Sequence, residues 1–262
     1  MKAIWNGAIG FGLVNIPVKI YSAVEDSNLD LDMLDKTDLS NIKFKRVNEQ
    51  TGKEVLWENI VKGYNYNGKY VVLTPEDFQE AAPEKSKILS IQQFVKEEEI
   101  DSVLFEAPYF LEPQKNGEHA YRLMLEALKK TGMAGVGTFI LREKENIGVI
   151  RPYRDSVLVL NKIRFAEEIR DHSELKVPET KPKAAEVEMA VTLVKQLSGK
   201  FDASAFKDTY NDDLMKIIKL KAKSPGKETK QPQMKVVVNK TTDLMEQLKA
   251  SLAATGKNKK AS

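Results

Sequence analysis

The stretch WNGAIGFGLVNIPVKIYSA, from Trp5 to Ala23, changes its hydrophobic alternation in the middle. Apolar side chains fall first on odd and then on even positions: Ile9 and Phe11, then Val14, Ile16, Val18 and Ile20. Because side chains of a strand alternate between its two faces, a change of parity indicates one extra residue in the hydrogen-bonded pairing of the strands. Glycine permits a bend there, and Pro17 confines its segment to an edge, a bulge or a strand start. The stretch therefore predicts one long bent strand, or two strands that turn a corner of a β-barrel.

The composition fits a globular protein with a highly charged surface. Of the 262 residues, 42% are hydrophobic and 30% are charged, so the chain can bury a sizeable core. It has no cysteine, which excludes disulfides, thiolate metal sites and a cysteine nucleophile, and is compatible with a reducing cytosol. No apolar run approaches the roughly 20 residues of a membrane helix, and the N-terminus has no signal-peptide core.

The net charge of +3 hides an asymmetry along the chain. Residues 216–262 hold 12 lysines against 3 acidic residues, a net charge of +9, which leaves −6 for the 215 residues before them. A mildly acidic globular part followed by a basic tail indicates a nucleic acid or another acidic surface as partner of the tail. A tail that only improves solubility is the alternative.

Residues 1–170 consist mainly of short strand segments joined by polar turns. Many strands, few helices and a β-branched composition favour an antiparallel β-barrel over βαβ units, so the fold class is mainly β with α. The alternation in NIKFKRV, residues 41–47, predicts a strand, and Asn67-Gly68 predicts a hairpin with a type I′ turn. Two helices are expected, one that begins at Thr74-Pro75 and one that Gly132 ends.

Two further parts follow a linker rich in proline and charge. Residues 171–222 predict a helical arm of two amphipathic helices, whose apolar faces must be covered by the barrel or by a partner subunit. Residues 223–262 predict a flexible basic tail. Within this tail, Leu244, Leu248 and Leu252 recur at helical spacing and predict a short helix, which is marginal in water on its own.

A search for catalytic chemistry finds little. The chain has two histidines, His119 and His172, and neither belongs to a triad-like pattern. The acidic run KEEEID, Lys96 to Asp101, is the densest carboxylate cluster and could hold Mg²⁺ in a nuclease, although such a run is more often a solvated strand end or turn. The glycine-rich segments match neither the dinucleotide fingerprint nor the P-loop. The lack of catalytic motifs therefore favours a binding protein over an enzyme.

Basic residues of the first part are candidates for contacts with nucleic acid. Lys43, Lys45 and Arg46 lie on the segment before a turn, and Lys53 follows that turn. Further along the chain, Arg142 is predicted to end one strand, and Arg151 and Arg154 flank Pro152 on the next. Such side chains bind phosphates without reading sequence, and aromatic residues are not interleaved with them in the manner of a single-strand binder, since only Phe44 and Tyr153 lie among these cations. Duplex backbone binding therefore fits better than base readout, and scattered surface charge is the alternative.

The opening stretch resembles the N-terminus of the bacterial Ku proteins. Its matching pattern is Trp5-x-Gly7-x-Ile9-x-Phe11-Gly12-Leu13-Val14-x-Ile16-Pro17-Val18-Lys19-x-Tyr21-Ser22-Ala23. Further matches follow in order: Lys45-Arg46-Val47, Ile60-Val61-Lys62-Gly63-Tyr64, Tyr70 to Thr74, Phe94-Val95, Glu99-Ile100-Asp101, Tyr109-Phe110-Leu111-x-Pro113, Ala120-Tyr121-x-Leu123, and Asp243-Leu244-Met245. The resemblance covers nearly the whole chain.

The resemblance implies a ring-shaped homodimer around double-stranded DNA. Each chain contributes a barrel core with a bridge, and the helical arm embraces the partner subunit. The ring loads onto DNA ends in non-homologous end joining and recruits or stimulates an ATP-dependent DNA ligase, without a catalytic step, metal or cofactor of its own. A cytoplasmic, nucleoid-associated location is expected. The resemblance adds Lys62 to the DNA-binding candidates and places Lys43, Lys45 and Arg46 on the inner face of the ring.

One departure from the family concerns the segment after Lys-Arg-Val. Many bacterial Ku proteins carry cysteine there, whereas this chain reads Asn48 to Gly52 without one. A metal site at this position is therefore not expected in this protein.

Overall fold

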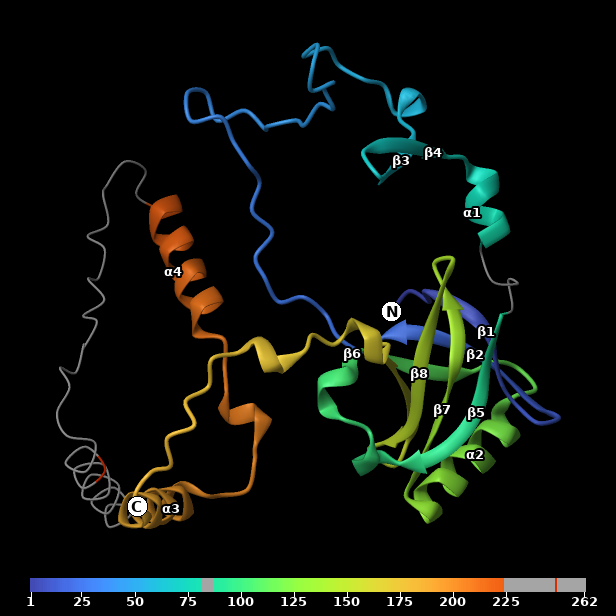
Figure 1. Cartoon of the computed structure of the whole chain (residues 1–262), viewed down its shortest axis with the longest axis vertical. Coiled ribbons are helices and arrows are strands. Elements are labelled where there is room, and N and C mark those ends of the chain that lie inside the picture. The colour runs from blue at the N-terminus through green and yellow to red at the C-terminus, as the bar shows by residue number, and fades with distance from the viewer. Residues whose placement is uncertain (82–86, 224–247, 249–262) are drawn as a thin grey trace. The chain divides into compact units, whose positions relative to one another are not determined.

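A computed structural model describes residues 1–81, 87–223 and 248 of the chain. The chain divides into two compact units. The first holds residues 1–26 and 30–172, and the second holds residues 27–29 together with the chain from residue 173 onward. Figure 1 shows the first unit as a β-barrel with one long helix packed against it, and the second as two helices joined by extended chain.

The opening stretch forms a tight hairpin, which corrects the prediction of a bent strand or a barrel corner. Strands β1 (Trp5–Phe11) and β2 (Val14–Ser22) pair antiparallel, with Phe11 opposite Val14. The two residues between them form the turn, and Gly12 has a φ of 56°, as the first central residue of a type II′ turn requires. Because Ile9 pairs with Ile16, odd positions of β1 lie opposite even positions of β2. The parity change therefore keeps the apolar side chains of both strands on the inner face.

Seven strands close the barrel in the order β1-β2-β6-β9-β8-β7-β5. The other members are β5 (Ile88–Lys96), β6 (Phe105–Pro113), β7 (Met133–Leu141), β8 (Lys144–Tyr153) and β9 (Val157–Ile163). All neighbours pair antiparallel except β1 and β5, which are parallel and complete the closure. The prediction of a mainly β fold with an antiparallel barrel is confirmed, apart from this one parallel pair.

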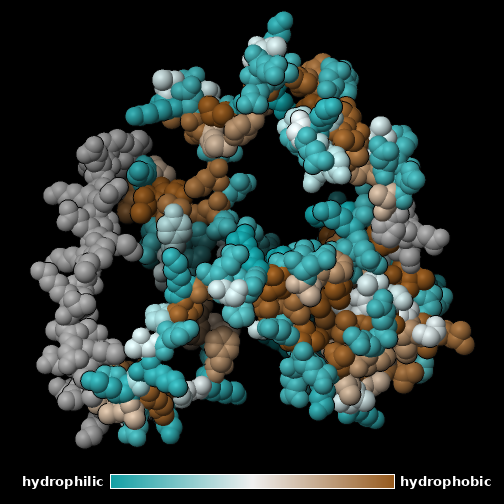
Figure 2. Space-filling view, in the orientation of Figure 1, coloured by the Kyte–Doolittle hydropathy of each residue, from teal (hydrophilic) through white to brown (hydrophobic). Residues whose placement is uncertain are grey.

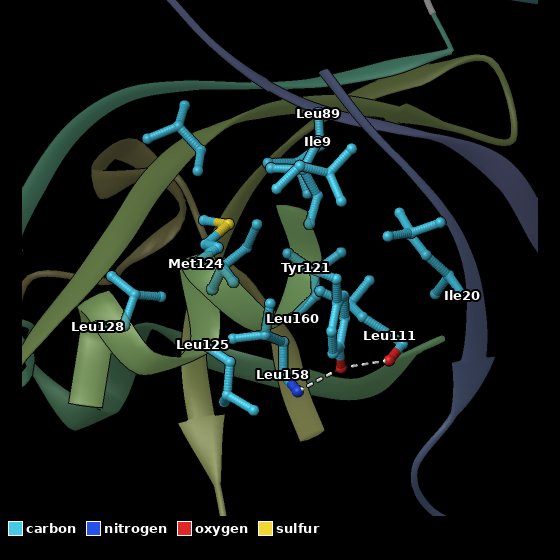
Figure 3. Packing of buried hydrophobic residues seen from close by; sticks show 14 of the residues in the cluster. Ile9, Ile20, Leu89, Leu111, Tyr121, Met124, Leu125, Leu128, Leu158 and Leu160 are labelled. Carbon is cyan, nitrogen blue, oxygen red and sulfur yellow. Dashed lines mark hydrogen bonds between the residues drawn. The ribbon is translucent and has the colours of Figure 1, made fainter. Parts of the chain in front are cut away.

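Helix α2 (Glu118–Thr131) contributes one apolar face to the barrel core. Leu125 on this face is fully buried, together with strand residues such as Ile9, Leu89 and Leu160. Figure 3 shows these side chains converging around Tyr121. The helix ends at Gly132, which has a φ of 66° and whose amide donates to the carbonyl of Leu128, as the sequence predicts.

The chain between β2 and β5 leaves the barrel and carries little regular structure. It contains β3 (Lys62–Tyr66), β4 (Lys69–Leu73) and α1 (Pro75–Ala81). The predicted type I′ hairpin is confirmed, because Asn67 and Gly68 both have positive φ. The amide of Asp77 donates to the Thr74 hydroxyl at 3.3 Å, and this bond caps α1. The strand predicted at residues 41–47 is absent, because its alternating side chains have no partner strand beyond isolated bridges at its two ends.

The second unit contains α3 (Ala184–Leu197) and α4 (Thr209–Lys223). The sequence predicts the second helix at residues 202–223, but α4 begins only at Thr209, because the residues before it include a separate turn at Ala203–Ala205. Other 3₁₀ turns of the chain lie at Trp57–Asn59, Glu97–Glu99, Ser102–Leu104, Ala166–Glu168 and His172–Glu174. Apart from residue 248, which is helical, the tail from residue 224 with its predicted leucine helix lies outside the described residues.

Candidate nucleic-acid interface

Three of the predicted DNA-binding residues gather on one irregular segment before a tight turn. Lys43, Lys45 and Arg46 are all exposed. The ammonium of Lys45 donates to the Glu54 carboxylate at 2.6 Å, and this hydrogen bond raises the pKa of Lys45. The guanidinium carbon of Arg46 lies 4.5 Å from the centre of the Trp57 ring. Both cations keep solvent-exposed faces, so a phosphate can replace or join their present partners.

The turn that follows these residues is held by the side chain of Asn48. Its amide oxygen accepts hydrogen bonds from the backbone N–H groups of Gln50 and Thr51, each at 3.0 Å. Backbone bonds from Asn48 to Lys53 and from Gly52 to Asn48, both 2.8 Å, complete the turn. Asparagine is well suited to this role because its side chain mimics a backbone carbonyl. The turn thus brings Lys53 back beside the segment of Lys45.

Lys62 and Arg142 lie on different elements of the first unit. Lys62 is the first residue of β3, and its ammonium lies 4.8 Å from the centre of the Phe78 ring of α1. Arg142 does not end a strand as predicted. It lies with Glu143 in the two-residue turn between β7 and β8, where both residues have positive φ. Such a turn projects the Arg142 side chain into solvent at the tip of a hairpin.

Arg151 and Arg154 differ in how freely they can reach a ligand. The Arg151 side chain is only 28% exposed, and its guanidinium donates to the buried Asn161 side chain at 3.0 Å and pairs with Glu97 at 3.2 Å. Arg154 is exposed in the β8–β9 turn and lies 5.2 Å from the centre of the Tyr153 ring. Of the two, Arg154 is the more accessible to an anion.

The structure places three further cations at or beside a groove that Arg142 lines. Lys144 and Lys162 line one groove with Arg142, and Arg164 pairs with Glu106 of the same groove. Lys162 donates to Glu106 at 3.0 Å. Lys144 stands two residues after Arg142, whereas Lys162 lies on β9 and Arg164 directly follows that strand, so the sequence does not show that these last two lie near Arg142.

The acidic run from Lys96 to Asp101 takes part in local structure. Glu97 pairs with Arg151, and Glu99 accepts from the amide of Lys96 at 3.2 Å. The Asp101 carboxylate accepts from the amide of Val103 at 3.0 Å and caps the next 3₁₀ turn. Within the described part of the chain, no three histidine or acidic side chains converge as metal ligands do. The arrangement fits a turn held by its own carboxylates better than a nuclease centre.

Large apolar side chains remain uncovered outside the barrel. No described residue between Ile20 and Leu89 is buried, and none after Ile163. The first of these regions exposes Phe44 (80%) and Trp57 (71%). Figure 2 shows hydrophobic residues at the surface of both regions. Exposed apolar area of this extent marks surfaces that bind other macromolecules.

No helix among the described residues has the length and apolar character needed to cross a membrane.

A family model and curated relatives agree on one family. A family model described as the Ku70/Ku80 beta-barrel domain matches residues 10–189. A curated relative from Cupriavidus necator, named "Non-homologous end joining protein Ku", is 39% identical over 99% of this chain and 80% of its own. The protein of that name from Coxiella burnetii is 35% identical over 99% of this chain and 97% of its own. Among solved structures, the SPOC domain of human PHD-finger protein 3 matches 62% of this chain and 95% of its own at 12% identity, with a TM-score of 0.31.

Proposed function

This chain is a member of the Ku family, and on that basis we propose that it binds ends of double-stranded DNA without sequence specificity, as a ring-shaped homodimer in non-homologous end joining. The observation that carries the proposal is that relatives named for non-homologous end joining match this chain over almost its full length. The proposed site of action is nucleoid DNA in the cytoplasm.

The basic residues support contact with the phosphate backbone. Five of them are exposed on the segment between β2 and β4, and we propose these as the main duplex contacts: Lys43, Lys45, Arg46, Lys53 and Lys62. Cations of this kind hold a duplex at any sequence because phosphates are the same at every step. Arg142 and Arg154 add exposed charge on barrel turns, and Arg151 adds less because Glu97 and Asn161 occupy its guanidinium.

A homodimer accounts for the uncovered apolar surface. The hairpin of β3 and β4 is a separate two-stranded sheet, and a hairpin of this size is marginally stable in water without a further layer. Helices α3 and α4 have no buried residue, although Val194 and Leu197 are each about two-thirds exposed on an apolar stripe of α3. A second copy of the chain would cover both regions, with α3 and α4 as the arm that grips the partner.

A closed ring would explain how a protein without base readout selects DNA ends. Such a ring threads onto a free end but cannot pass onto a covalently closed circle, so specificity comes from topology. We propose that the loaded ring recruits or stimulates an ATP-dependent DNA ligase and performs no catalytic step of its own.

The decisive experiment compares one duplex in linear and covalently closed circular forms in a gel-shift assay at fixed salt. We expect binding to the linear form alone, and retention of the protein when the DNA is circularised after loading. Equal binding to both forms would mean an open, charge-driven surface and would overturn the ring mechanism.

A further inference from the structure

A groove on the barrel shares only Arg154 with the basic residues considered above. It has a volume of about 730 Å³ and is formed by β2, β6, the first turns of α2 and the β8–β9 turn. We call it the aromatic groove, because Tyr21, Phe110 and Tyr153 line it together with Arg122 and Arg154. Its volume lies within the range of pockets that enclose small organic ligands.

The rings and guanidinium groups of the groove form a stacking surface. The ring centres of Phe110 and Tyr153 lie 5.8 Å apart at an interplanar angle of 47°. The guanidinium carbon of Arg154 lies 5.2 Å from the centre of the Tyr153 ring. Aromatic faces and arginine planes are the groups on which proteins stack unpaired bases without regard to sequence.

Both arginines of the groove are available to an anion. Among the described residues, no carboxylate lies within 4.0 Å of the guanidinium of Arg122 or Arg154, whereas Arg151 and Arg164 each have such a partner. Arg122 is exposed on α2. Free guanidinium groups beside aromatic rings suit a ligand that carries a planar group and a phosphate.

Two carboxylates restrict which phosphate ligand fits. Glu112 accepts a hydrogen bond from the Tyr21 hydroxyl at 2.6 Å, and Glu118 lies in the first turn of α2. Their charges offset those of the two arginines, so the groove has little net attraction for the closely spaced phosphates of a duplex. Carboxylates can, however, accept hydrogen bonds from the exocyclic amino groups of unpaired bases.

We propose that the aromatic groove holds an unpaired nucleotide of a single-stranded overhang at the DNA end. The base would stack beside Tyr153 and Phe110, and its phosphate would meet Arg122. This inference rests on the proposed function and extends it, since the ring would hold the duplex while the groove holds the overhang. The residues come from separate elements, so their spacing in the sequence gives no sign of the groove.

The test uses the full-length protein and two duplexes of equal double-stranded length, one blunt and one with a short overhang that contains 5-iodouracil. Fluorescence anisotropy at fixed salt measures both affinities, and irradiation followed by mass spectrometry locates the cross-link. We expect the overhang duplex to bind roughly five- to tenfold more tightly, in the range of one stacked base. The cross-link should fall on Tyr21, Phe110 or Tyr153. Overhangs of both polarities are tested.

The variant Arg122→Ala separates the groove from the duplex contacts. It should abolish the preference for the overhang and leave blunt-end affinity unchanged, while the matched control Lys130→Ala, also exposed on α2, should retain the preference. If the wild-type protein binds blunt ends but shows neither a preference for the overhang nor a cross-link to the groove, this inference is wrong and the proposed function is unaffected. If the wild-type protein failed to bind blunt ends, the proposed function itself would fall. If Arg122→Ala instead reduced ligase stimulation on blunt ends without any overhang effect, the groove would be a peptide site and the inference would again be wrong.

Discussion

A guanidinium nitrogen of Arg151 lies 3.2 Å from a carboxylate oxygen of Glu97, and this pair ties the acidic run to the barrel wall. The Nε atom of Arg151 also donates to the buried side chain of Asn161 at 3.0 Å. The Arg151 side chain therefore supplies a hydrogen-bond donor to the buried Asn161 amide oxygen and partly neutralises the carboxylates of the acidic run. This arrangement argues for a structural role of Arg151 beyond any contact with DNA.

We expect Arg151→Gln to reduce stability more clearly than DNA affinity. Losing a charged donor to a buried acceptor should lower the free energy of unfolding by about 1–2 kcal/mol. The exposed part of the pair contributes less, so Glu97→Gln alone should cost under about 1 kcal/mol. Urea unfolding of both single variants and the double variant measures the coupling. A large loss of DNA binding with unchanged stability would contradict the structural role.

The segment of Lys43, Lys45 and Arg46 yields a prediction about salt dependence. If a ring neutralises about six phosphates, the logarithm of the binding constant should fall with the logarithm of salt concentration at a slope of about −5. Replacing all three residues with alanine should weaken binding to every sequence equally and flatten the slope by up to about 3. Anisotropy titrations over a range of salt concentrations measure both quantities.

The matched control removes three exposed barrel lysines instead. Lys2, Lys115 and Lys130 are exposed, and among the described residues none lies within 4.0 Å of a carboxylate. Their triple alanine variant has the same net charge as the first variant and should keep the wild-type slope. Equal slopes for the two variants would show that net charge, rather than a located contact, governs binding.

The sequence predicts local elements of this protein better than their assembly. Gly132 and the Asn67-Gly68 pair determine the backbone conformation of only a few neighbouring residues. The helix end and the hairpin that they predict are therefore both found. The parity change near Gly12 is ambiguous, because a bulge and a two-residue turn shift the alternation equally. The strand predicted around Phe44 fails because alternation says nothing about whether a partner strand exists. Likewise, Lys144 and Lys162 lie on different strands and line one groove, which their spacing in the sequence does not encode.

Gly137 on β7 marks a point where the barrel leaves no room for a side chain. A Cβ atom there would lie 2.0 Å from the carbonyl oxygen of Ser90 on β5. Gly137→Ala should therefore force the strands apart and cost at least about 1–3 kcal/mol. The control is Gly199→Ala, since a Cβ atom at Gly199 would have no described heavy atom within 4 Å. That variant should stay within about 0.5 kcal/mol of the wild type in urea unfolding, and equal costs at both positions would refute the steric argument.

Truncation after Lys223 tests whether the helical arm is sufficient for dimerisation and whether the basic tail supports DNA retention or ligase stimulation. The removed segment carries eight lysines and three acidic residues, so its loss should weaken DNA retention or ligase stimulation. Because α3 and α4 remain, the truncated chain should still be a dimer in size-exclusion chromatography with light scattering. A monomer would show that the arm between Ala184 and Lys223 is not sufficient for dimerisation.

The hydroxyl of Tyr121 joins α2 to two strands of the barrel. It donates to the carbonyl of Leu111 on β6 and accepts from the amide of Leu158 on β9, both at 2.7 Å (Figure 3). Tyr121→Phe would leave both buried backbone groups without this partner and should cost about 1–3 kcal/mol. Tyr109→Phe is the control, because Tyr109 on β6 is half-buried, its hydroxyl has no hydrogen-bond partner among the described residues, and its loss should change stability little.

The same residue gives a pH dependence with a defined sign. Burial raises the pKa of Tyr121 above its ordinary value, with the Leu158 amide and the charge of Arg122 opposing that rise. The folded barrel thus favours the neutral phenol, so its contribution to stability is complete below pH about 10 and is lost as pH rises through the raised pKa. Unfolding titrations at neutral and alkaline pH should show the wild type losing more stability than Tyr121→Phe. An equal loss in both proteins would mean that the phenol titrates alike in the folded and unfolded chains, and that its burial in the barrel has no effect on its ionisation.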